Sequence, residues 1–190
     1  MNALKTNVKT WIVAVSLALG AIFVVTPLGT AGTQTAASQN QQDPTARLNN
    51  EVRHELAMLP NYGVFDFLEY QITGTEVRLM GAVVNPVTKT EAEGSVKHIN
   101  GVTRVVNDIT VLPLSPMDDQ IRREEYRAIF SAGQLASYSM GVNPAIHILV
   151  ANGHVALEGI VMNAGDRNLA YLRANSVSGV FSVTNDLRGD

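Results

Sequence analysis

The residues of this chain best suited to acid–base or metal chemistry are its four histidines. Asn152-Gly153 suits a two-residue hairpin turn, and such a turn places His147 opposite Glu158 on neighbouring strands. His147 and His154 then lie on one face, more than about 10 Å apart at about 3.4 Å per residue, which is too far to share a metal ion. We interpret the His147–Glu158 pair as surface electrostatics.

No motif of an established catalytic type occurs in the sequence. There is no HExxH segment and no phosphate-binding loop, and no serine or threonine is placed by a local pattern beside a histidine and a carboxylate. We therefore expect a protein that is not an enzyme, with no catalytic residue, no bound metal and no cofactor.

A second group of residues suggests chemistry at a phosphate-bearing surface. It lies in a predicted helix that begins near Asp118, and it consists of Arg122, Arg123, Tyr126, Arg127 and Phe130. Guanidinium groups bind phosphate oxygens in pairs, and amphipathic rings sit at membrane interfaces. These five residues are our candidates for lipid contact. Two observations weigh against this interpretation, because Glu124 and Glu125 dilute the charge and the two rings also suit core packing.

Composition limits the class of protein. The chain has 190 residues, of which 46% are hydrophobic and 16% charged, enough apolar material for one ordinary domain or two small ones. It has no cysteine. The absence of cysteine excludes disulfides, thiolate zinc sites, a thiol nucleophile and a cysteine-linked lipid anchor.

The first 31 residues have the layout of a secretory signal peptide. Lys5 and Lys9 precede an apolar run over 11–25, and Gly29-Thr30-Ala31 offers small residues at a cleavage site. We expect cleavage after about Ala31, with an uncleaved N-terminal anchor as the alternative. In either case the rest of the chain is predicted to be exported, periplasmic or otherwise, with a peripheral location at the outer membrane as one alternative.

Export changes the charge of the working chain. The signal removes two of 14 basic residues and none of the 17 acidic ones, which leaves 12 against 17 and a net charge of about −5. An acidic chain has no basic stripe for nucleic acid, so we expect no such partner. Residues 32–46 are mostly small and polar and are predicted to form a flexible tether.

The chain contains an internal repeat. A shift of 78 residues lays Glu76–Thr110 on His154–Arg188 without a gap, with about 11 of 35 positions identical where chance gives about two. Each copy reads as helix, strand, strand, helix, strand. We predict an α+β protein of two tandem αββαβ units at 47–112 and 119–188, joined by a linker at 113–118. Each unit is expected to have a three-stranded mixed sheet with two helices packed on one face.

Residues matched between the copies are interpreted as structural rather than functional: Gly81, Gly101 and Asn107 in the first copy, and Gly159, Gly179 and Asn185 in the second. The mid-strand glycines of this set are expected to let a helix pack closely. The later glycines are expected to end helices as left-handed caps. The asparagines are expected to bond local backbone.

Apolar residues are also predicted on the outward sheet faces. The expected hairpin register pairs Phe67 with Ala82 and Phe65 with Val84, and the second copy places Ile160 and Met162 in a similar position. A sheet face in contact with water alternates apolar inside with polar outside, so something must cover these residues. It is either the other unit or the linker helix, or a partner or lipid.

The repeated pattern resembles the BON domain of bacterial envelope proteins. The signature is V-x-L-x-G-x-V followed by G-V-x-x-V-x-N-x-[IL], at 77–83 and 101–109 and again at 155–161 and 179–187. Proteins similar to this are exported and often carry two such domains, without enzymatic activity. In some of them a helix of a BON unit contacts anionic lipid headgroups.

The resemblance implies a non-enzymatic envelope protein. It is expected to bind phospholipid membrane surfaces and to support envelope integrity or tolerance of osmotic stress. The alternative is a protein–protein interaction or assembly module of the periplasm, with an envelope protein or a second copy of the chain as its partner.

Overall fold

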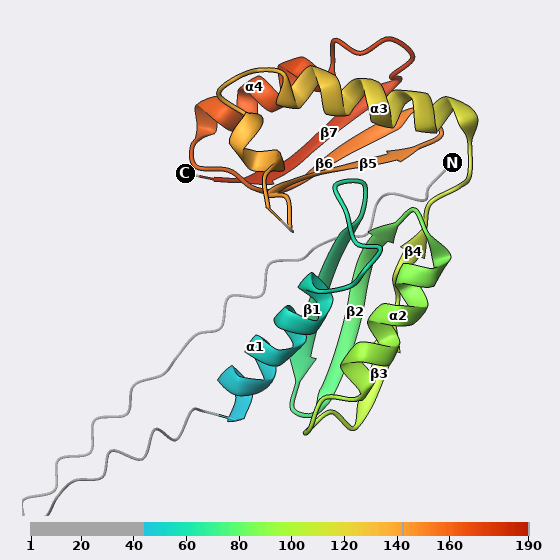
Figure 1. The fold of residues 1–190 in the computed structure, drawn as a ribbon, viewed down its shortest axis with the longest axis vertical. Helices are drawn as coiled ribbons and strands as arrows, with labels where there is room; N and C mark the ends of the chain where they lie inside the picture. The colour runs from blue at the N-terminus through green and yellow to red at the C-terminus, as the bar shows by residue number, and fades with distance from the viewer. Residues whose placement is uncertain (1–43, 142, 190) are drawn as a thin grey trace, which may run out of the picture. The chain divides into compact units, whose positions relative to one another are not determined.

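The computed structural model describes residues 44–141 and 143–189 (Figure 1). The predicted signal peptide and residues 32–43 of the predicted tether lie outside the described residues, whereas residues 44–46 already belong to a helix. The first unit contains α1 (Pro44–Ala57), β1 (Phe67–Thr73), β2 (Glu76–Val83), α2 (Pro86–Lys97), β3 (Arg104–Asn107) and β4 (Thr110–Val111). Among the residues described, no helix combines the length and the apolar character needed to cross a membrane.

The second unit has the same order with one addition. It contains α3 (Pro116–Phe130), the 3₁₀ helix η1 (Ala136–Ser139), β5 (Ile146–Ala151), β6 (His154–Ile160), α4 (Ala164–Ala174) and β7 (Ser182–Arg188). The chain is therefore an α+β protein of two αββαβ units, as predicted. The element η1 accounts for the longer front part of the second copy.

Both units have a mixed sheet built around the second strand. β2 pairs antiparallel with β1 and parallel with β3 and β4, and β6 pairs antiparallel with β5 and parallel with β7. The registers repeat at 78 residues: Val77 lies opposite Val105, and Val155 lies opposite Val183. In the first unit the predicted single last strand is interrupted at 108–109, which divides it into β3 and β4.

Each unit folds around its own apolar core. The first core includes Leu48, Val52, Leu56, Val77, Leu79, Val83, Ala92 and Val96. The second includes Ile121, Ile129, Ile146, Ile148, Val155, Leu157, Ala170 and Ala174. In both units two helices cover one face of the sheet and leave the other face outward (Figure 1). Burial of this apolar surface provides the main stabilisation of each unit.

The helix after each hairpin begins at a matched asparagine. The side-chain oxygen of Asn85 accepts a hydrogen bond from the N–H of Val87 at 2.9 Å, and that of Asn163 accepts one from Asp166 at 2.9 Å. These bonds satisfy N–H groups that a helix leaves free in its first turn. They explain locally why this asparagine occurs in both copies.

The mid-strand glycines have a different role from the one predicted. Gly81 and Gly159 have φ angles of 108° and 123°, and a Cβ at either position would lie 2.1 Å from the carbonyl oxygen of Phe67 or Ala145. The group that excludes a side chain is therefore the neighbouring strand's backbone, not a helix. Only glycine combines this positive φ with so close an approach.

The later glycines also differ from expectation. The helices α2 and α4 end at Lys97 and Ala174, and their C-caps, His98 and Asn175, are right-handed. Gly101 and Gly179 follow a few residues later, with φ of 103° and 86°. They shape the turn into the last strand instead of capping the helix, because the chain continues through a further turn first.

The matched asparagines of the last strands bond backbone on two sides. Asn107 donates to the carbonyl of Lys89 at 3.0 Å and accepts from the N–H of Ile109 at 3.2 Å. Asn185 donates to the carbonyl of Arg167 at 3.1 Å and accepts from Leu187. Each side chain therefore ties the last strand of its unit to the preceding helix.

Replacing Gly81 with alanine is expected to lower the free energy of unfolding by about 2 kcal/mol or more, because Cβ meets a carbonyl oxygen at a strained φ. Urea unfolding followed by circular dichroism measures the change. Gly94, inside α2, is the control: an added Cβ there meets nothing within 4 Å, so Gly94→Ala should stabilise by about 0.5–1 kcal/mol. Equal stability of Gly81→Ala and the wild type would contradict the close approach.

Candidate functional site

The helix α3 carries all five residues predicted to contact lipid, and the structure separates them into two groups. Ser115 caps the helix by accepting from the N–H of Asp118, and Pro116 occupies its first turn. Arg123, Tyr126 and Arg127 are exposed, Tyr126 by 40%. Arg122 and Phe130 are buried, with 3% and 8% exposed.

The start of α3 is fixed to the hairpin of its own unit. The two carboxylate oxygens of Asp118 accept hydrogen bonds from the N–H groups of Asn152 and Gly153, at 2.9 and 2.8 Å. Asn152 has a φ of 52° and Gly153 one of 78°, as a two-residue hairpin turn requires. Asp118 thus stabilises the turn between β5 and β6. As an acidic residue in the first turn of α3, it also interacts favourably with the helix dipole.

Arg122 is bound within the protein and not available to a headgroup. Its guanidinium donates to the carbonyl of Val150 at 2.7 Å and pairs with Asp119 at 2.5 Å. Its Nε is buried without a partner among the described residues. Val150 lies on β5, an edge strand, so Arg122 covers an edge carbonyl. The prediction that Arg122 contacts lipid is therefore corrected by its burial, and the same holds for Phe130.

Glu125 occupies a core position of α3. The buried residues of α1 are Leu48, Val52 and Leu56, and those at the same spacing on α3 are Ile121, Glu125 and Ile129. Glu125 thus stands where the first unit has Val52, and neither of its carboxyl oxygens has a hydrogen-bond partner among the described residues. Burial raises the pKa of Glu125 from 4.5 to about 8.

The two units meet along the free edge of β5. The N–H of Ile148 donates to the carbonyl of Val64 at 2.8 Å, so the α1–β1 loop of the first unit lies beside this strand. The ring of His147 lies 5.5 Å from the rings of Tyr62 and Phe67, measured between centroids. The α1–β1 loop therefore acts as an added, short partner for an edge strand.

This contact corrects the prediction of a surface histidine. His147 is only 5% exposed, its Nδ1 lies 3.3 Å from the carbonyl oxygen of Gly63, and burial lowers the pKa of the ring. Its neighbour across the hairpin is Glu158, as predicted. Burial, with Asp186 and Glu69 nearby, raises the pKa of Glu158 to about 7.

The apolar residues of the first unit's outward face are partly covered within the chain. Phe65 lies before β1 and does not pair with Val84, contrary to the expected register, whereas Phe67 pairs with Ala82 as expected. The ring of Phe65 packs edge-on against Tyr126 at 6.4 Å between centroids. These residues were expected to contact the other unit, the linker helix, a partner or lipid, and the contacts observed are with the second unit.

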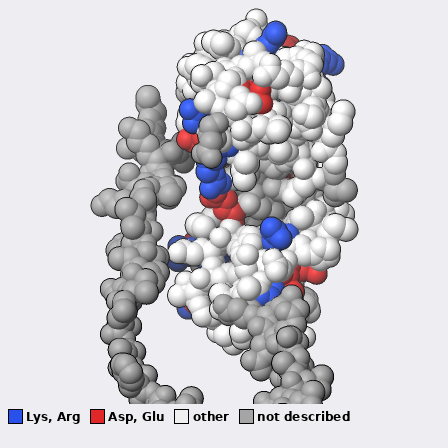
Figure 2. Space-filling view, turned by 90° about the vertical axis from the view of Figure 1, so that its left-hand side faces the viewer, with Lys and Arg blue, Asp and Glu red and all other residues white. Residues whose placement is uncertain are grey.

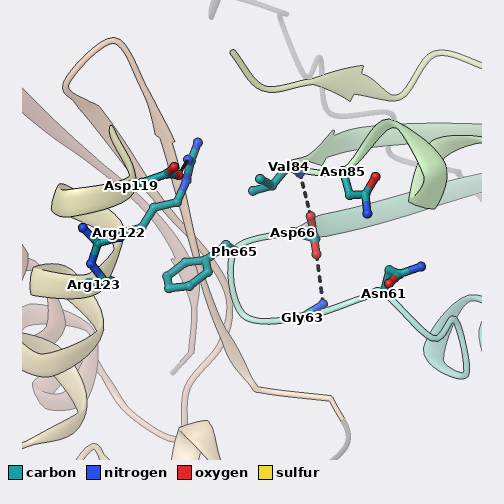
Figure 3. Close-up of a pocket in the computed structure, with 9 residues that line it drawn as sticks. All are labelled: Asn61, Gly63, Phe65, Asp66, Val84, Asn85, Asp119, Arg122 and Arg123. Atoms are coloured by element: carbon teal, nitrogen blue, oxygen red, sulfur yellow. Dashed lines mark hydrogen bonds and ion pairs between the residues drawn. The ribbon is translucent and has the colours of Figure 1, made fainter. Parts of the chain in front are cut away.

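A hollow of about 320 Å³ lies beside this contact (Figure 3). It is lined by Asn61, Gly63, Phe65, Asp66, Val84, Asn85, Asp119, Arg122 and Arg123. Asp66 accepts hydrogen bonds from the N–H groups of Val84 at 2.7 Å and Gly63 at 3.0 Å, so its carboxylate braces the loop. Two arginines and two aspartates line the hollow, which therefore presents no single charge to a ligand.

The apolar residues of the second unit remain on the surface. Ile160 and Met162 are 66% and 81% exposed, and Met140, which was not among the predicted residues of this face, is 71% exposed. No sequence pattern marks Met140, because it lies in the segment between α3 and β5 that is longer in the second copy. Across residues 44–141 and 143–189, no group of three or more His, Cys, Asp or Glu side chains is placed to hold a metal ion.

The BON domain family matches this chain at residues 45–113 and 118–189. These segments correspond to the two αββαβ units, and the chain belongs to the BON domain family, with two copies of the domain. BON domains are non-catalytic, and membership of the family suggests an envelope-associated protein.

Two similar solved structures come from CdsD, a structural protein of the type III secretion system of Chlamydia trachomatis. The first is 15% identical, covers 76% of this chain and 93% of that chain, and has a TM-score of 0.29. The second, the C-terminal domain of CdsD, is 14% identical, with coverages of 74% and 96% and a TM-score of 0.27. Overlaps this low inform neither fold nor function. No curated protein matches the chain.

Replacing Glu125 with leucine is expected to stabilise the second unit, and more so at high pH. Below about pH 4.5 the carboxyl is protonated in both states. Between there and pH 8 only the unfolded state ionises, so wild-type stability falls as pH rises. The gain should reach a few kcal/mol near pH 8.

Urea unfolding at pH 5 and pH 8 measures the effect. Glu125→Gln is the matched variant, because it removes the ionisation but keeps a polar group without a partner. It should lose the part of the pH dependence that Glu125 contributes, and it should gain less stability than the leucine variant. A gain for leucine that is the same at both pH values would refute the buried ionisable carboxyl.

Proposed function

We propose that this protein is a non-enzymatic envelope protein that adsorbs to anionic phospholipid surfaces through the exposed face of α3. The observation that carries the proposal is the placement of Arg123, Tyr126 and Arg127 on α3. Positions i, i+3 and i+4 of a helix share one face. Two guanidinium groups therefore flank one amphipathic ring, a combination suited to phosphate and to the headgroup boundary.

The two arginines of this face have no competing partner. Neither Arg123 nor Arg127 forms an ion pair with any described residue. Arg47, Arg78 and Arg104, in contrast, are engaged with carboxylates of the first unit. A cation without a partner has more to gain from a lipid phosphate, because no existing pair is broken.

Tyr126, between the two arginines, packs on two other rings. Its ring packs against Phe130 at 5.0 Å and against Phe65 at 6.4 Å, which leaves 40% of the residue exposed. A ring fixed on its inner side loses little conformational freedom on binding. The equivalent face of α1 carries Asn50, Arg53 and His54 and has no such ring.

Attraction to the membrane is expected to be local. Figure 2 shows one face on which basic and acidic groups are scattered and most of the surface is uncharged. The exported chain as a whole has an expected net charge of about −5, from 12 basic and 17 acidic residues. Binding should therefore be weak, and sensitive to salt in proportion to the few phosphates contacted.

Liposome flotation of the exported chain tests the proposal. Binding should increase when anionic lipid is added to zwitterionic vesicles, and Arg123→Ala/Arg127→Ala should reduce it at least ~10-fold at low salt. Arg53→Ala/Arg173→Ala is the matched control, since it removes two exposed charges from α1 and α4 and should bind nearly as well as the wild type. Equal loss in both double variants would indicate a nonspecific effect of charge and contradict the site.

A further inference from the structure

The end of the second unit where β6 leaves the sheet has an exposed apolar surface. It is formed by Met140, Ile160 and Met162, and we refer to it as the apolar end. Backbone bonds hold its parts together: Ile160 donates to the carbonyl of Ala145 at 3.0 Å, and Met162 donates to the hydroxyl of Tyr138 at 2.9 Å. These bonds bring the segments that carry Met140, Ile160 and Met162 to the same end of the unit.

The same corner of the first unit is a docking surface. The residues 78 positions before Ile160 and Met162 are Ala82 and Val84. Val84 lines the hollow together with Arg122, and Tyr62, in the loop before β1, lies against His147 of the second unit. Ala82 and Val84 are partly buried, whereas Ile160 and Met162 are largely exposed. The second unit therefore has, at its apolar end, the counterpart of a surface that binds protein in the first unit. None of the described residues covers it there.

We propose that the apolar end binds the apolar end of a second copy of this chain, about a two-fold axis. In such a pairing each copy presents the same surface, so three apolar side chains per chain leave water together. Methionine suits this arrangement because its flexible, polarisable side chain adapts to an irregular partner. The inference does not rest on lipid binding by α3.

A head-to-tail arrangement fits the chemistry less well. The first unit's corner is received by Arg122, Tyr126 and His147 of the second unit. At the corresponding positions the first unit has Asn49, Arg53 and Glu69, which are polar and offer methionine and isoleucine no apolar contact. Glu69 is already paired with Arg188 at 2.9 Å. A matching apolar surface is therefore provided by the second copy's own apolar end.

The absence of charge also favours a second copy over an anionic membrane. Residues 137–145 and 159–165 contain no Asp, Glu, Lys or Arg. Two copies can approach without like-charge repulsion, while a membrane-adsorbing surface of this size requires nearby cations. Arg188, opposite Ile160 in the sheet, is engaged with Glu69.

Sedimentation velocity of the exported chain from about 1 to 100 µM tests the proposal. The wild type should shift from monomer to dimer, and Met162→Asp should weaken the association at least ~10-fold, because it places a charge in the buried centre. Leu172→Asp is the matched control: Leu172 is 64% exposed on α4, and the same change there should leave association unaltered. Arg123→Ala/Arg127→Ala should also dimerise normally.

The lack of cysteine allows a second, geometric test. Met162→Cys should form disulfide-linked dimers on mild oxidation, since a two-fold axis near this residue brings the two thiols together, whereas Leu172→Cys should not. A wild type that stays monomeric at 100 µM, or equal cross-linking at both positions, would overturn the proposal. Lower liposome flotation of Met162→Asp with unchanged sedimentation would overturn it too, and would assign the apolar end to lipid.

Discussion

The free edge of β5 is the constraint on which the arrangement of this protein depends. An edge strand exposes N–H and C=O groups that must find partners or remain a site of unwanted pairing. Here the N–H of Ile148 binds the carbonyl of Val64, and the carbonyl of Val150 binds the guanidinium of Arg122. Both the contact between the units and the withdrawal of an arginine from the surface follow from satisfying one strand. Tyr62 of the α1–β1 loop then packs on His147, and Phe65 of the same loop packs on Tyr126 of α3.

Much of the fold could be predicted because both copies of the repeat carry the same residue pattern, so each copy supported the assignment of elements in the other. Alternating apolar residues and the shift of 78 defined the strands and their register, so Phe67 was correctly placed opposite Ala82. The αββαβ order followed from the same pattern. The role of Gly81 could not be inferred in detail, since a mid-strand glycine fits close approach by a helix or by a neighbouring strand equally well. Only coordinates identify the carbonyl that excludes its side chain.

The candidate site was predictable in composition but not in orientation. An arginine-rich helix indicates a phosphate-binding surface, yet the sequence does not say which arginine faces inward. That choice depends on Val150, 28 residues away, and on the α1–β1 loop. Glu125 was interpreted as diluting the surface charge, whereas it occupies the core position of Val52. The first helices of the two units thus differ in their inward residues, and in the second unit one of these, Arg122, lies beside the contact with the first unit.

The two hydrogen bonds from the turn at Asn152-Gly153 to Asp118 have a mechanical consequence. Leu112 is hydrogen-bonded to Val83, and α3 begins at Pro116, so only three residues separate the last bonded strand position of the first unit from the helix of the second. The linker is therefore too short to let the units separate far. A force applied along the chain would reach the turn between β5 and β6 through the hydrogen bonds of Asp118.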